Sequence, residues 1–333
     1  MDPFTQAGLG AAVAASLSKG NCIRTAIVVG ALAGAAPDLD ILIRSDQDPL
    51  LSLEYHRHFS HSLLVAPLIG VAVAFLYHLI FTRGKVPLLP LMVFGTAGAT
   101  THGLLDACTS YGTRLYWPFS QLRESWDIIS IIDPIFSLPL LFFTLLGFLL
   151  RRLSFVRIAC FLCGLYFCFG FYQKERARTL TKLLAKERGH VCERLSVRPS
   201  FANTILWRTL YRSGSSYYVD ALRIIPGQET ILYKGETIPF LGKSQMDIWT
   251  RENQSLTTAV DRFAHFSQGY LYQPREQPEI LADLRYSILP NSTKPLWGIA
   301  IQSEPNSNQV EFVTFRRRDD ATLKKFFSML WGE

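Results

Sequence analysis

The first half of the chain carries apolar runs that are long enough to cross a lipid bilayer. They cover residues 63–81, 86–105, 134–150 and 155–172, and a membrane-spanning helix needs about 20 mostly apolar residues. Because backbone polar groups find no water in lipid, such runs fold as helices that pair these groups internally. We therefore expect an α-helical multi-span membrane domain over residues 1–173.

The N-terminal stretch of this domain is rich in glycine and alanine. Its apolar pieces, residues 7–17 and 23–36, are short, and their small residues allow close helix packing. We expect an interfacial or re-entrant helix first, followed by one short span over 23–36. With the longer runs, the sequence predicts about 4–5 spans plus this N-terminal helix.

After Tyr172 the chain becomes polar. Residues 174–189 combine charges with leucines on one side, which predicts an amphipathic linker helix. Residues 190–333 predict a smaller β-rich (α+β) extramembrane domain that ends in a helix over 320–330. We expect its strands near residues 204–211, 217–225, 230–233, 284–289, 297–302 and 310–315.

The net charge of +7 does not indicate a nucleic-acid-binding protein. Basic residues gather at the ends of apolar runs, as at Arg83 and Lys85 or at Arg151 and Arg152. Such flanking positions are typical of membrane proteins, whereas a nucleic-acid site needs a basic patch on one face. We expect the lipid bilayer as a partner and no nucleic acid, and the sequence indicates no particular protein partner.

Three polar motifs interrupt or end the apolar runs. They are Pro-Asp-Leu-Asp at 37–40, His-Arg-His-Phe-Ser-His-Ser at 56–62 and Thr-His-Gly-Leu-Leu-Asp at 101–106. His102 and Asp106 are four residues apart, so a helix places both side chains on one face. An imidazole and a carboxylate in that arrangement can share a metal ion. Ionisable residues in or near a membrane are costly and indicate a function.

The other two motifs supply further ligand candidates, His56 and His61 in one and Asp38 and Asp40 in the other. Histidines at a helix start can simply be solvated, and Pro-Asp can simply mark a helix stop. Three histidines within six residues, beside a second His/Asp pair, favour a site. A mixed nitrogen and oxygen ligand set suits a divalent metal ion; Zn²⁺ is favoured, and Mn²⁺ and Fe²⁺ fit as well.

The order of the spans predicts that the three motifs meet at one membrane face. If residues 23–36 cross once, Asp38 and Asp40 emerge on the side to which residues 86–105 later return with His102. Most basic residues near the span ends lie on the opposite side, which the positive-inside rule makes cytoplasmic. The motifs would then face the periplasm. The basic run at 174–188 argues for the reverse orientation.

At these residues the chain resembles the YdjM-like family of bacterial inner-membrane proteins, which are described as membrane-bound metal-dependent hydrolases. The resemblance implies membrane residence, metal dependence and hydrolase activity, and it does not specify a substrate. Some relatives carry a histidine where this chain has Gln6, and His58 stands at a position that is often glycine. The matching segments are residues 1–6, 9–12, 33–40, 56–57, 60–62, 101–102, 105–106, 112–113, 117–120, 133–134 and 203–207.

We expect a metal-activated water that attacks an ester or phosphoester. The metal ligands predicted first are His61, His102 and Asp106, followed by His56 and Asp40. Asp38 is expected to act as a general base or to orient a ligand. Arg57 is expected to hold an anionic group of the substrate, and a site at the interface suits a lipid or lipid-linked substrate.

Two non-catalytic hypotheses stay open. The metal could be structural, in a membrane scaffold whose C-terminal domain binds a partner, or the cluster could lie on an ion path. A hydrolase needs an open coordination position, whereas a structural site is closed. The runs at 134–150 and 155–172 contain no acidic residue and no histidine, which argues against transport.

Overall fold

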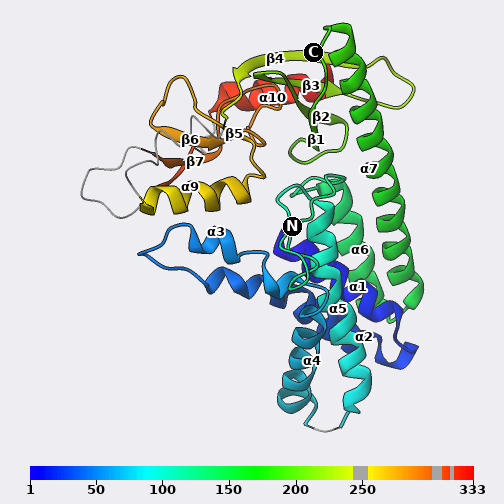
Figure 1. The fold of residues 1–333 in the computed structure, drawn as a ribbon. Coiled ribbons are helices and arrows are strands. Elements are labelled where there is room, and N and C mark those ends of the chain that lie inside the picture. The colour runs from blue at the N-terminus through cyan, green and yellow to red at the C-terminus, as the bar shows by residue number, and fades with distance from the viewer. Residues whose placement is uncertain (84, 243–253, 302–309, 316–318) are drawn as a thin grey trace. The chain divides into compact units, whose positions relative to one another are not determined.

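The computed structural model describes residues 1–83, 85–242, 254–301, 310–315 and 319–333 (Figure 1). The chain forms two compact units. The first unit is helical and comprises Met1–Ile43, Tyr55–Phe171 and Phe201–Asn203. The second comprises Arg44–Glu54, Tyr172–Ser200 and Thr204–Glu333. The domain boundaries at 173 and 189 stay predictions.

The helical unit is built from six helices within the described residues, and short helical turns lie between several of them. The turns that carry site residues are η2 (Ala36–Leu42), which follows α2 directly, and η3 (Phe59–His61), which precedes α4. The helices are α1 (Pro3–Ser16), α2 (Ile23–Ala35), α4 (Ala66–Tyr77), α5 (Leu88–Cys108), α6 (Pro134–Leu150) and the first part of α7 (Leu153–Glu187).

Small residues let α1, α2 and α5 lie against one another (Figure 1). A Cβ atom on Gly10 of α1 would lie 2.5 Å from the Gly30 carbonyl oxygen, and one on Gly98 of α5 would lie equally close to it. Gly30 therefore contacts both neighbouring helices through its backbone. This is the packing that small residues permit in membranes, where lipid gives apolar side chains no drive to associate.

The prediction of about 4–5 spans was too high. By length and composition, three helices of the described residues can cross a membrane: Gly20–Leu42, Leu88–Cys108 and Leu153–Glu187. A bent pair, Leu51–His61 with Ala66–Thr82, raises the number to four if it forms one span. In the apolar run over 63–81 the α-helix begins only at Ala66, so the helix is shorter than the run. The helix α6 has only 17 residues, which is about 25 Å of helix at 1.5 Å per residue.

The linker helix predicted over 174–189 is not a separate helix, because residues 174–187 form the last turns of α7 in the structure. The helix therefore continues without a break from its apolar part into its charged part. Within the second unit, the Gln173 side-chain amide donates to the carbonyl oxygens of Thr204 (3.2 Å) and Ile224 (2.7 Å). This end of α7 thus packs on the sheet that follows it.

The second unit is β-rich, as the sequence predicts, and its described residues form two antiparallel four-stranded sheets. The first sheet has the order β1 (Arg194–Pro199), β2 (Leu206–Ser213), β3 (Ser216–Arg223) and β4 (Ile231–Pro239). The second has the order β5 (Leu271–Tyr272), β6 (Ile280–Asp283), β7 (Trp297–Ala300) and β8 (Phe312–Thr314). Among the described residues the second unit also contains α9 (Gln254–Phe266), α10 (Asp320–Trp331) and most of the short helix α3 (Leu51–Tyr55).

The strand predicted over 284–289 is wrong, because the strand in this region, β6, ends at Asp283. The Asp283 carboxylate accepts from the backbone N–H of Arg285 (3.0 Å) and binds its guanidinium (2.7 Å). A side chain that bonds the backbone two residues onward stabilises a turn against a strand. The strand predicted over 297–302 agrees with β7, although its last residue lies outside the described residues.

One segment of the second unit comes from between two parts of the first. Residues Arg44–Glu54 follow η2 in the chain and precede His56, yet they belong to the unit that contains α9. Arg262 of α9 pairs with Asp48 (3.0 Å) and with Glu54 (2.9 Å). These ion pairs fix a connector whose two ends lead to the polar motifs at 37–40 and 56–62.

Candidate metal centre

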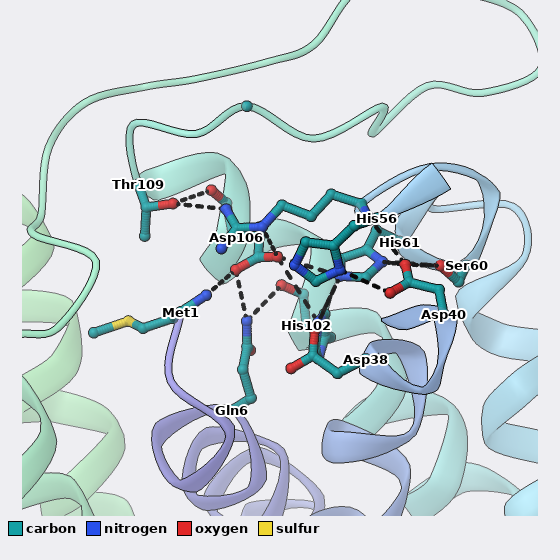
Figure 2. Close-up of polar contacts among 12 residues, drawn as sticks. Met1, Gln6, Asp38, Asp40, His56, Ser60, His61, His102, Asp106 and Thr109 are labelled. Atoms are coloured by element: carbon teal, nitrogen blue, oxygen red, sulfur yellow. Dashed lines mark hydrogen bonds and ion pairs between the residues drawn. The ribbon is translucent and has the colours of Figure 1, made fainter. Parts of the chain in front are cut away.

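The three polar motifs meet in the helical unit (Figure 2). Asp38 and Asp40 lie on η2, where Pro37 follows the end of α2 and a tighter 3-10 turn replaces the α-helix. His61 ends η3, and His102 and Asp106 lie one turn apart on α5. His56 and Arg57 precede η3. All seven predicted site residues therefore belong to one connected cluster.

Two imidazoles face each other at the centre of this cluster. The Nε2 atoms of His61 and His102 are 2.9 Å apart, and the Asp38 Oδ1 atom lies 3.5 Å from the first and 3.4 Å from the second. Figure 2 shows the three side chains converging. Both histidines are fully buried, whereas the Asp38 side chain is 22% exposed.

The partners of the other ring nitrogens define the tautomer of each imidazole. His102 Nδ1 lies 2.6 Å from the Gly34 carbonyl oxygen, which can only accept, so this nitrogen carries the proton. His61 Nδ1 lies 3.2 Å from Asp40 Oδ2, also an acceptor, and 3.0 Å from Ser60 Oγ. When neutral, both rings therefore present an Nε2 lone pair to the same point. Histidine ligands of metals are commonly held in this way by a carbonyl or a carboxylate.

Asp106 lies beside the imidazole pair and is fully buried. Its Oδ2 atom is 3.3 Å from His61 Nε2 and 3.2 Å from Arg57 Nε, and among the described residues it has no hydrogen-bond partner. Its Oδ1 atom accepts from the Gln6 side-chain amide (2.9 Å) and contacts the Met1 amino group. One carboxylate oxygen is thus anchored, while the other faces the imidazoles.

Asp40 organises the segment that carries the histidines. Its Oδ2 atom accepts from Ser60 Oγ (2.7 Å), from the backbone N–H of Arg57 (3.0 Å) and from His61 Nδ1. Its Oδ1 atom lies 2.8 Å from His56 Nδ1. The backbone of Arg57 has a φ of 64°, a left-handed conformation that is uncommon for a residue other than glycine, and the bond to Asp40 stabilises it.

The Arg57 guanidinium points to Asp106 and not to an open surface. It pairs with that carboxylate, donates to Thr109 Oγ1 (3.1 Å) and lies over the Tyr111 ring. The residue is 4% exposed. These contacts favour a positioning role, in which Arg57 balances the buried charge of Asp106, over the predicted contact with substrate.

Sequence reasoning missed three residues that support the cluster: Gln6, Ser60 and Gly103. A Cβ atom on Gly103 would overlap the His61 carbonyl oxygen, so only glycine lets η3 approach α5 this closely. Gly103 and Ser60 are each next to a histidine of the cluster in the sequence, and this position could have identified them as supporting residues. Gln6 stands where the sequence comparison expected a histidine in some relatives, and in the structure its side-chain amide donates to Asp106.

The fold and the cluster define a helical membrane protein with buried histidines and carboxylates at the end of its spans. The family model of the YdjM inner membrane protein matches residues 1–177, more than half of the 333 residues. The chain belongs to the YdjM inner membrane protein family, as the resemblance predicted. The matched region includes every residue of the cluster. No match was found among curated proteins or among solved structures.

Proposed function

We propose that this protein is a metal-dependent hydrolase of the inner membrane that acts on an ester or phosphoester. The observation that carries the proposal is the 2.9 Å approach of two buried Nε2 atoms whose Nδ1 atoms both face acceptors. Two lone pairs at this distance repel each other unless a proton or a metal cation lies between them, and the two Nε2 atoms could share either. The nearby carboxylates of Asp38 and Asp106 make a mixed nitrogen and oxygen set that suits Zn²⁺, Mn²⁺ or Fe²⁺.

His61, His102 and Asp38 are the ligands that the geometry favours, because their donor atoms lie within 4.8 Å of one another. A divalent ion held by them would polarise a substrate oxygen and lower the pKa of a bound water towards about 7. Asp106 supplies a buried negative charge beside the two imidazoles, and Arg57 and Gln6 hold it in position.

A substrate would approach the metal from the side of Asp38. Its side chain is 22% exposed, whereas His61, His102 and Asp106 are fully buried. A metal site that keeps one side open is typical of catalysis, and a closed one of structural metals. This exposure favours the hydrolase over the scaffold with a structural metal.

A lipid or lipid-linked substrate fits the surroundings of Asp38. The next residue, Leu39, is 65% exposed, and Ile41 and Leu42 are 62% and 70% exposed. All three belong to the candidate span Gly20–Leu42, so they lie where acyl chains would surround them. The proposed substrate would keep its chain in the bilayer and present its polar ester group to Asp38.

The test is metal content. The full chain is purified in detergent, reconstituted with Zn²⁺ or Mn²⁺ and assayed by elemental analysis, together with His61→Ala, His102→Ala and the control His265→Ala. His265 is exposed on α9 and lies outside the cluster. We expect wild type and control to retain metal and both site variants to lose it.

Wild-type protein that retains no metal after reconstitution would contradict the proposal. Protein that holds metal in this pattern, and still cleaves no member of a panel of phospholipid and water-soluble phosphoesters, would instead favour the scaffold. Asp38→Asn adds a sharper test, because an amide is a much poorer ligand than a carboxylate. We expect this variant to lose metal, whereas a residue that acted only as general base would leave it bound.

We also propose that the cluster faces the periplasm. Lys19, Arg83, Lys85 and Arg151 lie at the span ends away from the cluster, and such residues favour the cytoplasmic side. A single cysteine introduced at the exposed position Asp46, in a chain without its other cysteines, should react with a membrane-impermeant maleimide in intact cells. Reaction only after lysis would reverse the assignment.

A further inference from the structure

A second group of donor atoms lies beside the imidazole pair. Asp38, Asp40 and His56 each offer a ligand atom, and these atoms also lie within 4.8 Å of one another. Asp38 belongs to both groups. The His56 side chain is 38% exposed, so this outer group is the more open of the two.

The two carboxylate oxygens of Asp40 have different contacts, and this difference suits Asp40 to bind a cation. Its Oδ2 atom is held by Ser60, by His61 and by the backbone of Arg57. Its Oδ1 atom contacts only His56 Nδ1 among the contacts that the structure describes for it. The carboxylate is therefore fixed through one oxygen and presents the other, together with an imidazole nitrogen, on the side of Asp38.

We propose that Asp38, Asp40 and His56 bind a second divalent cation, which shares Asp38 with the cation at His61 and His102. This inference rests on the proposed function, because the shared carboxylate is part of the first site. Two cations joined by a carboxylate, about 3.5–4 Å apart, are a recurrent arrangement in enzymes that cleave phosphoesters. The two cations would stabilise the attacking oxygen and the leaving oxygen, between which the phosphoryl group is transferred.

The charges point to the same substrate class. Asp38, Asp40 and Asp106 supply the negative charge of the cluster, and Arg57 offsets part of it. Two divalent cations would leave the site with excess positive charge. A phosphoester carries a negative charge that a carboxylic ester lacks, so the doubly loaded site favours a phosphoester.

The two positions should differ in affinity and in exchange rate. The inner position has two fully buried imidazoles, whereas the outer one has a single imidazole that is more than one-third exposed. Water competes for the outer cation, so we expect it to bind more weakly and to exchange first during dialysis against a chelator.

The test is the stoichiometry of Mn²⁺ in the full-length protein in detergent, measured by elemental analysis and by electron paramagnetic resonance. We expect about two equivalents and an exchange-coupled signal in wild type, as for a two-metal site. His56→Ala should retain about one equivalent with an uncoupled signal. His265→Ala is the control, and the melting temperature of each variant reports whether it is folded.

Several results would overturn the second position. Wild type with one equivalent that His56→Ala retains would leave the proposed function intact and remove this inference alone. Loss of all metal in a folded His56→Ala variant would place His56 in a single site. Wild type without any metal would instead contradict the proposed function itself.

Discussion

At the residue scale, the cluster depends on side chains that are not themselves candidate metal ligands. Gln6 is the clearest case, because it is buried and its amide donates to Asp106 Oδ1 (2.9 Å). Substitutions of groups that orient metal ligands lower metal affinity by about 10- to 100-fold. We expect Gln6→Ala to weaken Zn²⁺ binding by about 10-fold, as measured by competition with a chromophoric chelator. Gln47→Ala, at an exposed position, should bind like wild type, and equal affinities of the two variants would argue against this role.

Gly103 gives a second prediction at this scale. A methyl group there would overlap the His61 carbonyl oxygen, so Gly103→Ala must displace η3 from α5 and separate the two imidazoles. We expect this variant to lose bound metal although its helices remain. Gly164 of α7 has no atom within 4 Å of the corresponding position, and Gly164→Ala should retain metal, since alanine in a helix is favoured over glycine by roughly 0.5–1 kcal/mol. Metal in both variants at the wild-type level would contradict the argument.

The sequence was sufficient to predict which residues lie close together at the site, but not the contacts that each of them makes there. His102 and Asp106 share a helix face through their spacing, and the order of the spans brought the other motifs to them. The separate tasks of Asp38 and Asp40 could not be derived, because they depend on the 3-10 turn of η2. That turn aims Asp38 at the Nε2 atoms and Asp40 at the Nδ1 atom of His61.

At the element scale, α6 and α7 are joined through one buried carboxylate. Asp133 caps the N-terminus of α6 by accepting from the Phe136 N–H (3.3 Å), and it accepts from the Tyr166 hydroxyl of α7 (2.8 Å). Loss of a capping side chain costs about 1 kcal/mol, and loss of the partly buried hydrogen bond to Tyr166 adds roughly 0.5–1.5 kcal/mol. We expect Asp133→Ala to lower the melting temperature in detergent.

Asp133→Asn is the matched control for this prediction. Asparagine caps helices about as well as aspartate, and burial raises the pKa of Asp133, which means that the charged form is already disfavoured. We therefore expect the asparagine variant to melt close to wild type. A loss as large as that of the alanine variant would show that the charge, and not the hydrogen bonds, matters.

The apolar runs located the helices but not the number of crossings. The hydrophobicity of a segment indicates that it is buried in lipid or protein. Most of the residues between η3 and α4 are also apolar, so hydrophobicity does not show where one helix ends and the next begins. Residues 63–65 are as apolar as those that follow, yet Ser62 accepts from the Val65 N–H (3.1 Å) and the helix starts only at Ala66. Local side-chain bonds of this kind decide where a helix begins.

At the scale of the whole molecule, the second unit holds the connector between two motifs of the site. Arg262 pairs with Asp48 and Glu54, and these groups are about one-third exposed, so each pair contributes little alone and the two together more. We expect Arg262→Ala to increase hydrogen exchange of residues 44–54 by several-fold. Arg275→Ala, on the exposed turn before β6, should leave it unchanged.

A charge swap between Arg262 and Glu54 is a more specific test of these ion pairs. Arg262→Glu should increase exchange further through repulsion, and combination with Glu54→Arg should reverse part of the effect. If the connector exchanges equally in all variants, the ion pairs do not hold it. The sequence could not show this arrangement, because Arg262 lies more than 200 positions beyond its partners and no local pattern links charges so far apart.

Gly30 has a consequence for how this fold can change over generations. Its carbonyl oxygen is closely approached by α1 at Gly10 and by α5 at Gly98, and a Cβ atom at position 30 would overlap the Ala14 Cβ atom of α1, so a side chain at any of these three glycines would require a neighbouring helix to move. Replacing Ala14 by glycine would remove only one of these contacts, because a Cβ atom at position 30 would also lie 2.5 Å from the Gly10 carbonyl oxygen, a backbone atom that no substitution removes. We therefore expect libraries randomised at Gly10, Gly30 and Gly98 to return almost exclusively the parental combination, while positions on the lipid-facing sides of the same helices accept wide variation.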